Sequence, residues 1–219
     1  MTITNFADHL SQYVQDQLVQ LDLLKEPELS TPEPGEIVRR LKIALKNEME
    51  ASELAASWMA STPEVDVKLA LARQAGDEAH HYRLIEKHLA KMGTDTSSFN
   101  PAAEGYGPMF QMLSGLHTTI ERVAAAQLTR ESLALKKNEQ FIEFCEAAGD
   151  RETAAFYREQ IQPDEQWHVD LGHRFLQKYA TTAELQEKAT SAAQSVLDLA
   201  VKIQNKQWKE LNVSHAPGC

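Results

Sequence analysis

Apolar residues recur at helical spacing along nearly the whole chain. In the first segment, Phe6, Leu10, Val14 and Leu18 fall four positions apart, which predicts an amphipathic helix over residues 6–24. The same period predicts further helices over residues 36–60, 63–92, 109–147, 151–180 and 183–211. None of these segments alternates apolar and polar residues as a half-buried strand does. The pattern therefore predicts an all-α fold.

Turn-forming residues mark the ends of these helices. Pro27 ends the first helix, and residues 30–35 form a linker. Thr62 is expected to cap the third helix, with Pro63 at its first position. Gly93 and Gly149 are suited to the position just after the end of a helix. Asp150, and either Thr181 or Thr182, are expected to cap the starts of the following helices.

The chain length predicts a single domain, and the helix pattern divides it into three parts. With 219 residues it is long enough for a substantial core. We expect an accessory helix in residues 1–29, a bundle in 36–180, and a C-terminal helix and tail in 181–219. The polar stretch 94–108 is long enough to cross from one helix pair of a bundle to the other.

Net charge, hydropathy and cysteine content indicate which kinds of partner and which cellular compartment to expect. A formal net charge of -10 disfavours nucleic acid as a ligand. No apolar run reaches transmembrane length, and the N-terminus lacks the basic start of a signal peptide. Cys145 and Cys219 are the two cysteines, and they form no disulfide framework or Cys-x-x-Cys module. We therefore expect a cytoplasmic protein that binds neither membranes nor nucleic acid.

One five-residue pattern occurs twice and carries the candidate chemistry. Residues 77–81 read Asp-Glu-Ala-His-His, and residues 164–168 read Asp-Glu-Gln-Trp-His. On a helix, Glu78 and His81 share a face, as do Glu165 and His168, so each pair can hold one ion. The alternative is two pairs of surface residues on amphipathic helices. The duplication also indicates an internal repeat of two helical hairpins.

Two more carboxylates are expected level with the motifs. Glu48 and Glu78 lie almost equally far from the loop at 61–64, and Glu131 and Glu165 from the loop at 147–150. Glu48 and Glu131 each have apolar residues at helical neighbour positions, and a lone inward carboxylate is costly unless it is paired or bound to metal. Near Glu131, Glu121 and Gln127 also approach the inner face, so they stay open as alternatives.

The order Glu48, Glu78-x-x-His81, Glu131, Glu165-x-x-His168 resembles the ferritin-like superfamily of carboxylate-bridged di-metal proteins. The resemblance covers about residues 36–180. It implies a four-helix bundle holding two iron ions, or manganese, with Glu78 and Glu165 as the bridges. Asp before each Glu resembles the oxygenase branches, and residues 63–92 are somewhat similar to the catalytic-subunit family of phenylacetyl-CoA epoxidase.

The resemblance implies a non-haem oxidase or oxygenase that activates O2 to oxidise a small organic substrate. Electrons then come from an external donor, because the chain has no flavin or iron–sulfur motif. A homodimer is compatible with the sequence. One alternative is a ferritin- or rubrerythrin-like protein that stores iron or removes peroxide, which the missing rubredoxin module and the helices outside the bundle disfavour. Another is a metal-free subunit, which the complete ligand set disfavours.

The Asp residues of the motifs are candidates for supporting the histidines. A metal-bound His usually donates its second ring N–H to a carboxylate. Because His81 must turn toward the metal, we expect a crossed arrangement in which Asp77 reaches His168 and Asp164 reaches His81. The alternative is that both Asp side chains face solvent.

Other residues near the motifs allow two interpretations each. Tyr82 faces the same way as Glu78, so it is a candidate redox-active or hydrogen-bonding residue, although core packing is the simpler role; the same holds for Tyr157. Pro163 predicts either a helix break or a kink that directs Glu165. A last group is expected not to bind metal: His80 at the surface, Trp167 in packing, His117 and His173.

Overall fold

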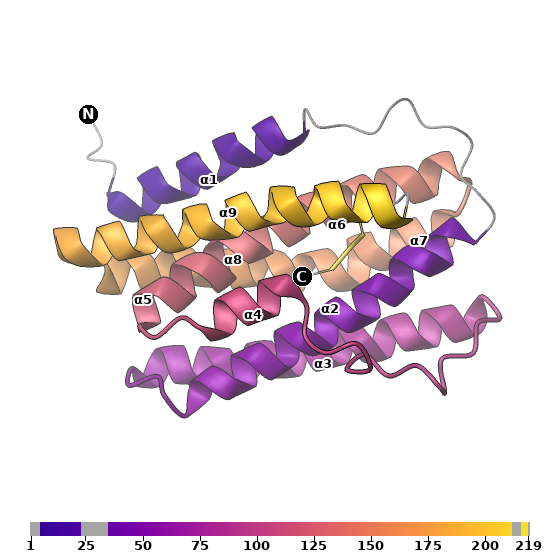
Figure 1. Ribbon diagram of the computed structural model, residues 1–219, viewed down its shortest axis with the longest axis horizontal. Helices are drawn as coiled ribbons and strands as arrows, with labels where there is room; N and C mark the ends of the chain where they lie inside the picture. The colour runs from indigo at the N-terminus through magenta and orange to yellow at the C-terminus, as the bar shows by residue number, and fades with distance from the viewer. Residues whose placement is uncertain (1–4, 23–34, 212–215, 219) are drawn as a thin grey trace.

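All regular structure in the computed structural model is helical over the residues it describes, which are 5–22, 35–211 and 216–218 (Figure 1). The predicted linker before Gly35 and the second cysteine, Cys219, lie outside these residues. The elements are α1 (Phe6–Asp22), α2 (Glu36–Met59), α3 (Val65–Lys91), α4 (Pro108–Ser114), α5 (Thr119–Arg122), η1 (Val123–Arg130), α6 (Glu131–Ala147), α7 (Arg151–Phe156), η2 (Tyr157–Ile161), α8 (Gln162–Tyr179) and α9 (Ala183–Leu211). The two η segments are π-helical.

Two helical hairpins form the centre of the molecule. The first is α2 with α3. In the second, α5, η1 and α6 make one uninterrupted rod that packs against the rod of α7, η2 and α8. The hairpins meet through α3 and α8, while α1 and α9 cover the second hairpin on the side away from α2 and α3 (Figure 1). None of the described helices is long and apolar enough to cross a lipid bilayer.

The predicted single helix over residues 109–147 was wrong, because the chain breaks between α4 and α5. Gly115 caps the end of α4, and Thr118 begins α5 with a capping box. In that box Thr118 Oγ1 accepts from the Glu121 N–H at 3.3 Å, and Glu121 Oε2 accepts from the Thr118 N–H at 2.9 Å. Apolar spacing continues across this break, so periodicity alone does not reveal it.

The start of the third helix also differs from the prediction. Helix α3 begins at Val65, with Glu64 as its N-cap in an extended conformation. Thr62 does not cap α3, because its hydroxyl donates to the Trp58 carbonyl at 2.9 Å and closes α2 instead. The first helical position predicted at Pro63 is therefore two residues early.

The remaining described boundaries agree with the sequence. Gly93 and Gly149 have φ angles of 78° and 81°, the left-handed conformation expected after a helix end. Asp150 Oδ1 accepts from the Thr153 N–H at 3.0 Å at the start of α7. Thr182 Oγ1 accepts from the Leu185 N–H at 3.3 Å at the start of α9, so Thr182 rather than Thr181 supplies that cap.

Each rod of the second hairpin contains a π-helical turn just before its predicted ligand. Segment η1 ends directly before Glu131. Segment η2 ends at Ile161, and α8 then has Pro163 in its first turn. Proline has no N–H to donate to a helical hydrogen bond. The wide η2 turn directly before it leads into α8 without a break in the helical rod. Pro163 therefore lies in a new first turn, that of α8, directly after a helical distortion, and its effect on the direction of Glu165 stays a prediction. π-turns within α-helices occur frequently at functional sites.

The apolar core consists of two clusters with a polar layer between them. Along α2, Leu45 belongs to one cluster and Leu54 to the other, and Glu48 lies between them. Along α3, Leu71 and Ile85 mark the two clusters on either side of Glu78. All six predicted ligands lie in this layer, enclosed by hydrocarbon above and below.

Gly172 allows α8 to approach η1 closely beside this layer. A Cβ at Gly172 would lie 2.7 Å from Leu128 N and 2.8 Å from the Gln127 carbonyl carbon. We predict that Gly172→Ala lowers the free energy of unfolding by about 1–3 kcal/mol, because backbone atoms have to move apart. Chemical denaturation of the metal-free protein measures this.

Gly76→Ala is the matched control, because a Cβ at that α3 position meets nothing within 4 Å. There the usual helix propensity should raise stability by up to about 1 kcal/mol. Equal effects of the two substitutions would show that the close approach at Gly172 has no energetic consequence.

Candidate metal centre

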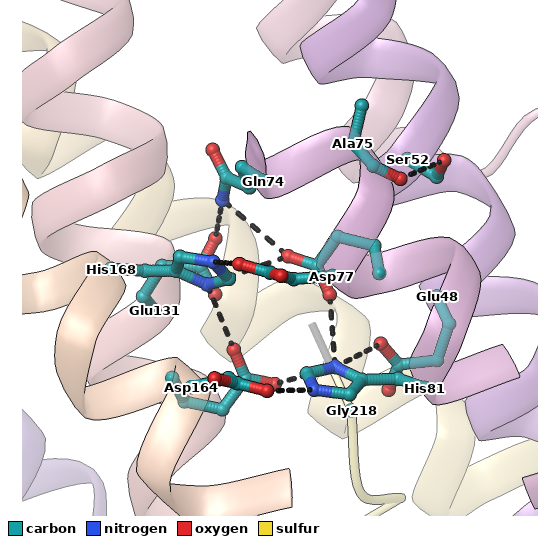
Figure 2. Close-up of polar contacts among 12 residues, drawn as sticks. Glu48, Ser52, Gln74, Ala75, Asp77, His81, Glu131, Asp164, His168 and Gly218 are labelled. Carbon is teal, nitrogen blue, oxygen red and sulfur yellow. Dashed lines mark hydrogen bonds and ion pairs between the residues drawn. The ribbon is translucent and has the colours of Figure 1, made fainter. Parts of the chain in front are cut away.

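Four separate helical segments bring the six predicted ligands together. Glu48 comes from α2, the first Glu-x-x-His pair from α3, Glu131 from the start of α6, and the second pair from α8. Figure 2 shows four of them, Glu48, His81, Glu131 and His168, facing one another between the helices. All six are fully buried, with no exposed surface: Glu48, Glu78, His81, Glu131, Glu165 and His168.

The six residues form two overlapping groups that could each hold a metal ion. The first group adds Glu48 and His81 to a shared pair of carboxylates, and the second adds Glu131 and His168 to the same pair. Within each group, one ligand atom from every residue lies within 4.8 Å of the others. The shared pair is Glu78 and Glu165, the two residues expected from the sequence to be bridges.

Both histidine rings turn Nδ1 toward the carboxylates. His81 Nδ1 lies 3.3 Å from Glu78 Oε2 and 3.5 Å from Glu48 Oε2. His168 Nδ1 lies 3.3 Å from Glu165 Oε2 and 3.7 Å from Glu78 Oε1. The donor atoms that an ion requires therefore converge from both motifs.

Glu48 is the observation that best tests whether these residues fit a metal. Neither of its carboxylate oxygens has a hydrogen-bond partner in the described part of the chain, and both are buried. His81 Nδ1 has none either, despite its short distances to carboxylates. A buried carboxylate without hydrogen bonds costs several kcal/mol unless a cation compensates it. Oxygen-rich ligands with imidazole suit iron and manganese, so the residues fit these ions.

Glu131 differs from Glu48 because hydrogen bonds hold one of its oxygens. Gln74 Nε2 donates to Glu131 Oε1 at 2.6 Å, and Arg130 Nη2 lies 2.7 Å from the same atom. Gln127 Nε2 in turn donates to Gln74 Oε1 at 2.9 Å. The second group is thus oriented by a buried polar network, which fixes the direction in which Glu131 presents its other oxygen.

In the metal-free protein, Glu78 and the two histidines shift one another's pKa values toward the charged forms. Burial opposes a charged imidazole, but the contacts with Glu48 and Glu78 raise the pKa of His81 to about 12. Likewise, contacts with Asp77 and Glu165 overcome burial and raise the pKa of His168 to about 11. Burial also opposes ionisation of Glu78, yet the two histidines lower its pKa to about 2.

The other two carboxyl groups shift in the opposite direction. Burial raises the pKa of Glu48 well above its usual range, and the charge of Glu78 adds to this shift. Burial and Glu78 together raise the pKa of Glu165 to about 7. In the metal-free site, both imidazoles are therefore protonated at neutral pH, and the raised pKa values of Glu48 and Glu165 favour protonation of these two carboxyl groups as well.

Loading with metal should release these protons. Two histidine protons must leave at pH 7, because the pKa values of His81 and His168 lie near 12 and 11 in the metal-free state. We predict that the overall apparent constant for binding both divalent ions rises at least about 100-fold per pH unit from pH 7 to 9. Calorimetric titrations in buffers of different ionisation enthalpy give the proton count. A count near zero would contradict this.

Both crossed Asp–His contacts expected from the sequence are present. His168 Nε2 lies 3.3 Å from Asp77 Oδ2, and His81 Nε2 lies 3.3 Å from Asp164 Oδ2 (Figure 2). Each Asp thus reaches the histidine of the opposite motif. Although burial opposes it, the contact with His168 lowers the pKa of Asp77, which stays ionised to accept the Nε2–H. These contacts keep Nδ1 directed at the carboxylates.

Arg73 joins the two Asp residues at the protein surface. Its Nε lies 3.2 Å from Asp77 Oδ2, and its Nη2 lies 4.0 Å from Asp164 Oδ1. Its guanidinium also lies 3.5 Å from the ring centroid of Trp167. Trp167 therefore packs, as expected, and helps to hold Arg73 over the Asp pair.

Replacing either Asp with Asn should weaken metal binding without unfolding the protein. We predict a loss of affinity of about tenfold or more for Asp77→Asn and for Asp164→Asn, because each histidine loses the carboxylate that orients it. Asp170→Asn is the control, since Asp170 is exposed on α8 and accepts from Gln166 Nε2 at 2.9 Å, away from both histidines. Unchanged affinity in both test variants would contradict a role for the crossed contacts.

The other candidate residues lie outside the cluster. Tyr82 is buried in the apolar cluster with Leu41 and Ile85, and no hydrogen bond or ion pair between described residues joins it to a predicted ligand. Tyr157 packs edge-on against Phe141 at 4.9 Å between ring centroids. The remaining candidates are accounted for elsewhere: His80 and His117 are exposed, His173 contacts Asp8 at 2.8 Å, Glu121 caps α5, and Gln127 supports Gln74.

Sequence reasoning missed the supporting residues Gln74 and Arg130. Gln74 lies four positions before Glu78, so helical spacing already places it on the same face of α3. Arg130 directly precedes Glu131, and a neighbouring position on an α-helix points elsewhere. The π-turn η1 ends at Arg130, and no pattern in the apolar residues signals that turn.

Comparisons with known proteins identify a family but no function. The chain matches the profile of one protein family over residues 20–209. Searches of the curated proteins and of the solved structures return no match. Because the matched region covers most of the chain, the protein belongs to the family described as "Protein of unknown function (DUF455)".

Proposed function

We propose that this protein is a non-haem di-iron oxidase or oxygenase built on a ferritin-like four-helix bundle. The observation that carries the proposal is the pair of overlapping ligand groups sharing Glu78 and Glu165. In ferritin-like di-metal proteins, two helices each give one Glu and two others each give a Glu-x-x-His pair. Glu48 and Glu131 fill the first role here, and the duplicated motifs fill the second.

Charge supports two divalent ions rather than one. The ligand set contains four carboxyl groups and two imidazoles. Two divalent cations balance four ionised carboxylates, whereas the protonated histidines do so only in part. The hard, oxygen-rich set suits iron(II) and manganese(II) about equally. We propose iron, because the chemistry inferred from the resemblance consumes O2.

The chain itself provides a dry and rigid enclosure for this chemistry. Two iron(II) ions held by the six ligands would supply electrons to O2 and a centre that oxidises an organic substrate. The apolar clusters on either side shield the polar layer from bulk solvent. Asp77 and Asp164 hold the imidazoles in one orientation, and Gln74 with Arg130 fixes one oxygen of Glu131. An external donor is needed to restore the electrons.

Oxygen uptake with a size measurement tests this function. The protein is loaded anaerobically with iron(II), separated from unbound metal and exposed to O2. We expect uptake of O2 by the loaded protein, none by a His81→Ala, His168→Ala variant, and no cage by light scattering. Mineralisation of hundreds of iron atoms per assembly would replace this proposal with iron storage. Absence of uptake by a fully loaded protein would also contradict it.

A further inference from the structure

Residues 216–218 lie directly against the Glu48 side of the candidate site. All three are buried, although they follow α9 near the end of the chain. A Cβ at Gly218 would lie 2.7 Å from Glu48 Oε1 and 3.5 Å from Ala44 Cβ. Figure 2 shows Gly218 beside His81 and Glu48. We call residues 216–218 the strap.

Two hydrogen bonds between described residues hold the strap. The Gly218 N–H donates to Asn138 Oδ1 at 2.8 Å, and Asn47 Nδ2 donates to the Pro217 carbonyl at 3.4 Å. Gly218 adopts a φ angle of 93°, in the left-handed region that other residues enter only at a cost. A glycine is therefore needed both for this backbone conformation and for the close approach to Glu48.

A small cavity borders the strap at Gly218, which lies against Glu48, and at Arg130, which contacts Glu131. Its volume is about 60 Å³, and its walls include Gly218 and the polar side chains of Asn47, Arg130 and Lys137 together with the apolar side chains of Leu133 and Ile203. This space holds about two water molecules, whereas cavities for organic ligands measure roughly 300–1,000 Å³. With the strap in place, a molecule the size of O2 fits and an organic substrate does not.

Glu48 is also the ligand best able to admit a molecule. Hydrogen bonds hold Glu131 through Gln74 and hold both histidine rings through their Asp partners. Neither oxygen of Glu48 has a hydrogen bond among the described residues, although Oε2 lies 3.5 Å from His81 Nδ1. Gly218 of the strap both lines the cavity and lies against Glu48.

We infer that the cavity between α2, α4, α6 and α9 is the substrate entrance of the site, and that the strap must move aside to admit a small organic molecule. This inference rests on the proposed function, because it assumes an ion beside Glu48. It adds where the substrate enters and which residues close the entrance. The walls combine apolar side chains with the polar side chains of Asn47, Arg130 and Lys137, which suits a molecule that has both apolar and polar parts.

The rate at which a chelator removes iron tests the strap. The anaerobic iron(II) protein is first assayed for metal content and then mixed with excess ferrozine. In Gly218→Ala, the new Cβ meets Glu48 and the left-handed backbone is disfavoured, so the strap should detach. We expect iron removal to be about tenfold faster or more. Gly105→Ala is the control, because Gly105 has a φ angle of 72° and open space around its Cβ position.

A second variant loosens the strap without touching Glu48. Asn138→Ala removes the acceptor of the Gly218 N–H and should also speed iron removal. Asn138 Nδ2 donates to Gln162 Oε1 at 3.3 Å as well, so Gln162→Ala serves as the control for that lost contact. Thermal melting of each loaded variant shows whether the fold is intact.

The outcomes separate this inference from the proposed function. Full metal content with faster removal in both strap variants, and not in the controls, supports the strap as the closure of the entrance. Full metal content with removal at the unmodified rate in both overturns it and leaves the di-metal site intact. Failure of the unmodified protein to bind iron overturns the proposed function and this inference together.

Discussion

Replacing both His81 and His168 with alanine is expected to abolish binding of the two ions. Each histidine is the only nitrogen ligand in its group, and each group loses one of its four ligands when its histidine is removed. A single His81→Ala or His168→Ala variant should retain at most one tightly bound ion. Metal analysis after gel filtration measures the ratio of iron to protein for each variant.

His88→Ala provides a matched control for the double replacement. His88 is a buried histidine on α3 like His81, but its ring contacts Thr153 at 2.8 Å and stacks on Phe156, away from the ligands. This variant should lose stability and keep both ions. Retention of two ions by the double His81, His168 variant would show that the motifs do not form the metal site.

Replacing Glu48 with methionine should have opposite effects on the metal-free and the loaded protein. Both oxygens of Glu48 are buried without a hydrogen bond in the described structure, and burial raises its pKa well above the usual range. Methionine removes this buried carboxyl group, whose ion-pair contact is His81 Nδ1 at 3.5 Å, at similar volume. We expect the free energy of unfolding of the metal-free protein to rise by about 1–3 kcal/mol. His81 keeps Glu78 as a partner at 3.3 Å.

In the presence of iron(II) the order should reverse. The unmodified protein gains stability from bound metal, because the ions bind the folded state alone. The Glu48→Met variant loses a ligand and most of this gain. Glu143→Met, at an exposed position of α6, should change neither quantity by more than about 0.5 kcal/mol. A metal-free Glu48→Met protein less stable than the unmodified one would show that Glu48 has a structural role.

Much of the fold followed from the sequence, because the helices carry clear amphipathic patterns and recognisable ends. Gly93, Gly149 and Asp150 act as their residue types predict. Apolar spacing continues across the break between α4 and α5 and so does not predict it, whereas the capping box of Thr118 with Glu121 is a local sequence signal for a helix start. The π-turns were missed because they add a residue to a helix without changing its composition.

The candidate ligands could be predicted because two constraints coincide. A duplicated motif fixes four residues, and the symmetry of each hairpin about its loop selects Glu48 and Glu131. The crossed Asp–His contacts followed from the direction that a ligating ring must take. Contacts between distant segments had no such signal: the placement of Gly218 against Glu48 depends on how the chain returns after α9, which no local pattern specifies.

Iron content combined with Mössbauer spectroscopy tests the central claim most directly. The protein is loaded anaerobically with ⁵⁷Fe(II), freed of unbound metal and measured before and after exposure to O2. The proposed site predicts about two iron ions per chain, and after oxidation two high-spin ferric ions coupled to a diamagnetic ground state. One iron per chain, or ferric ions without magnetic coupling, would contradict the di-iron site.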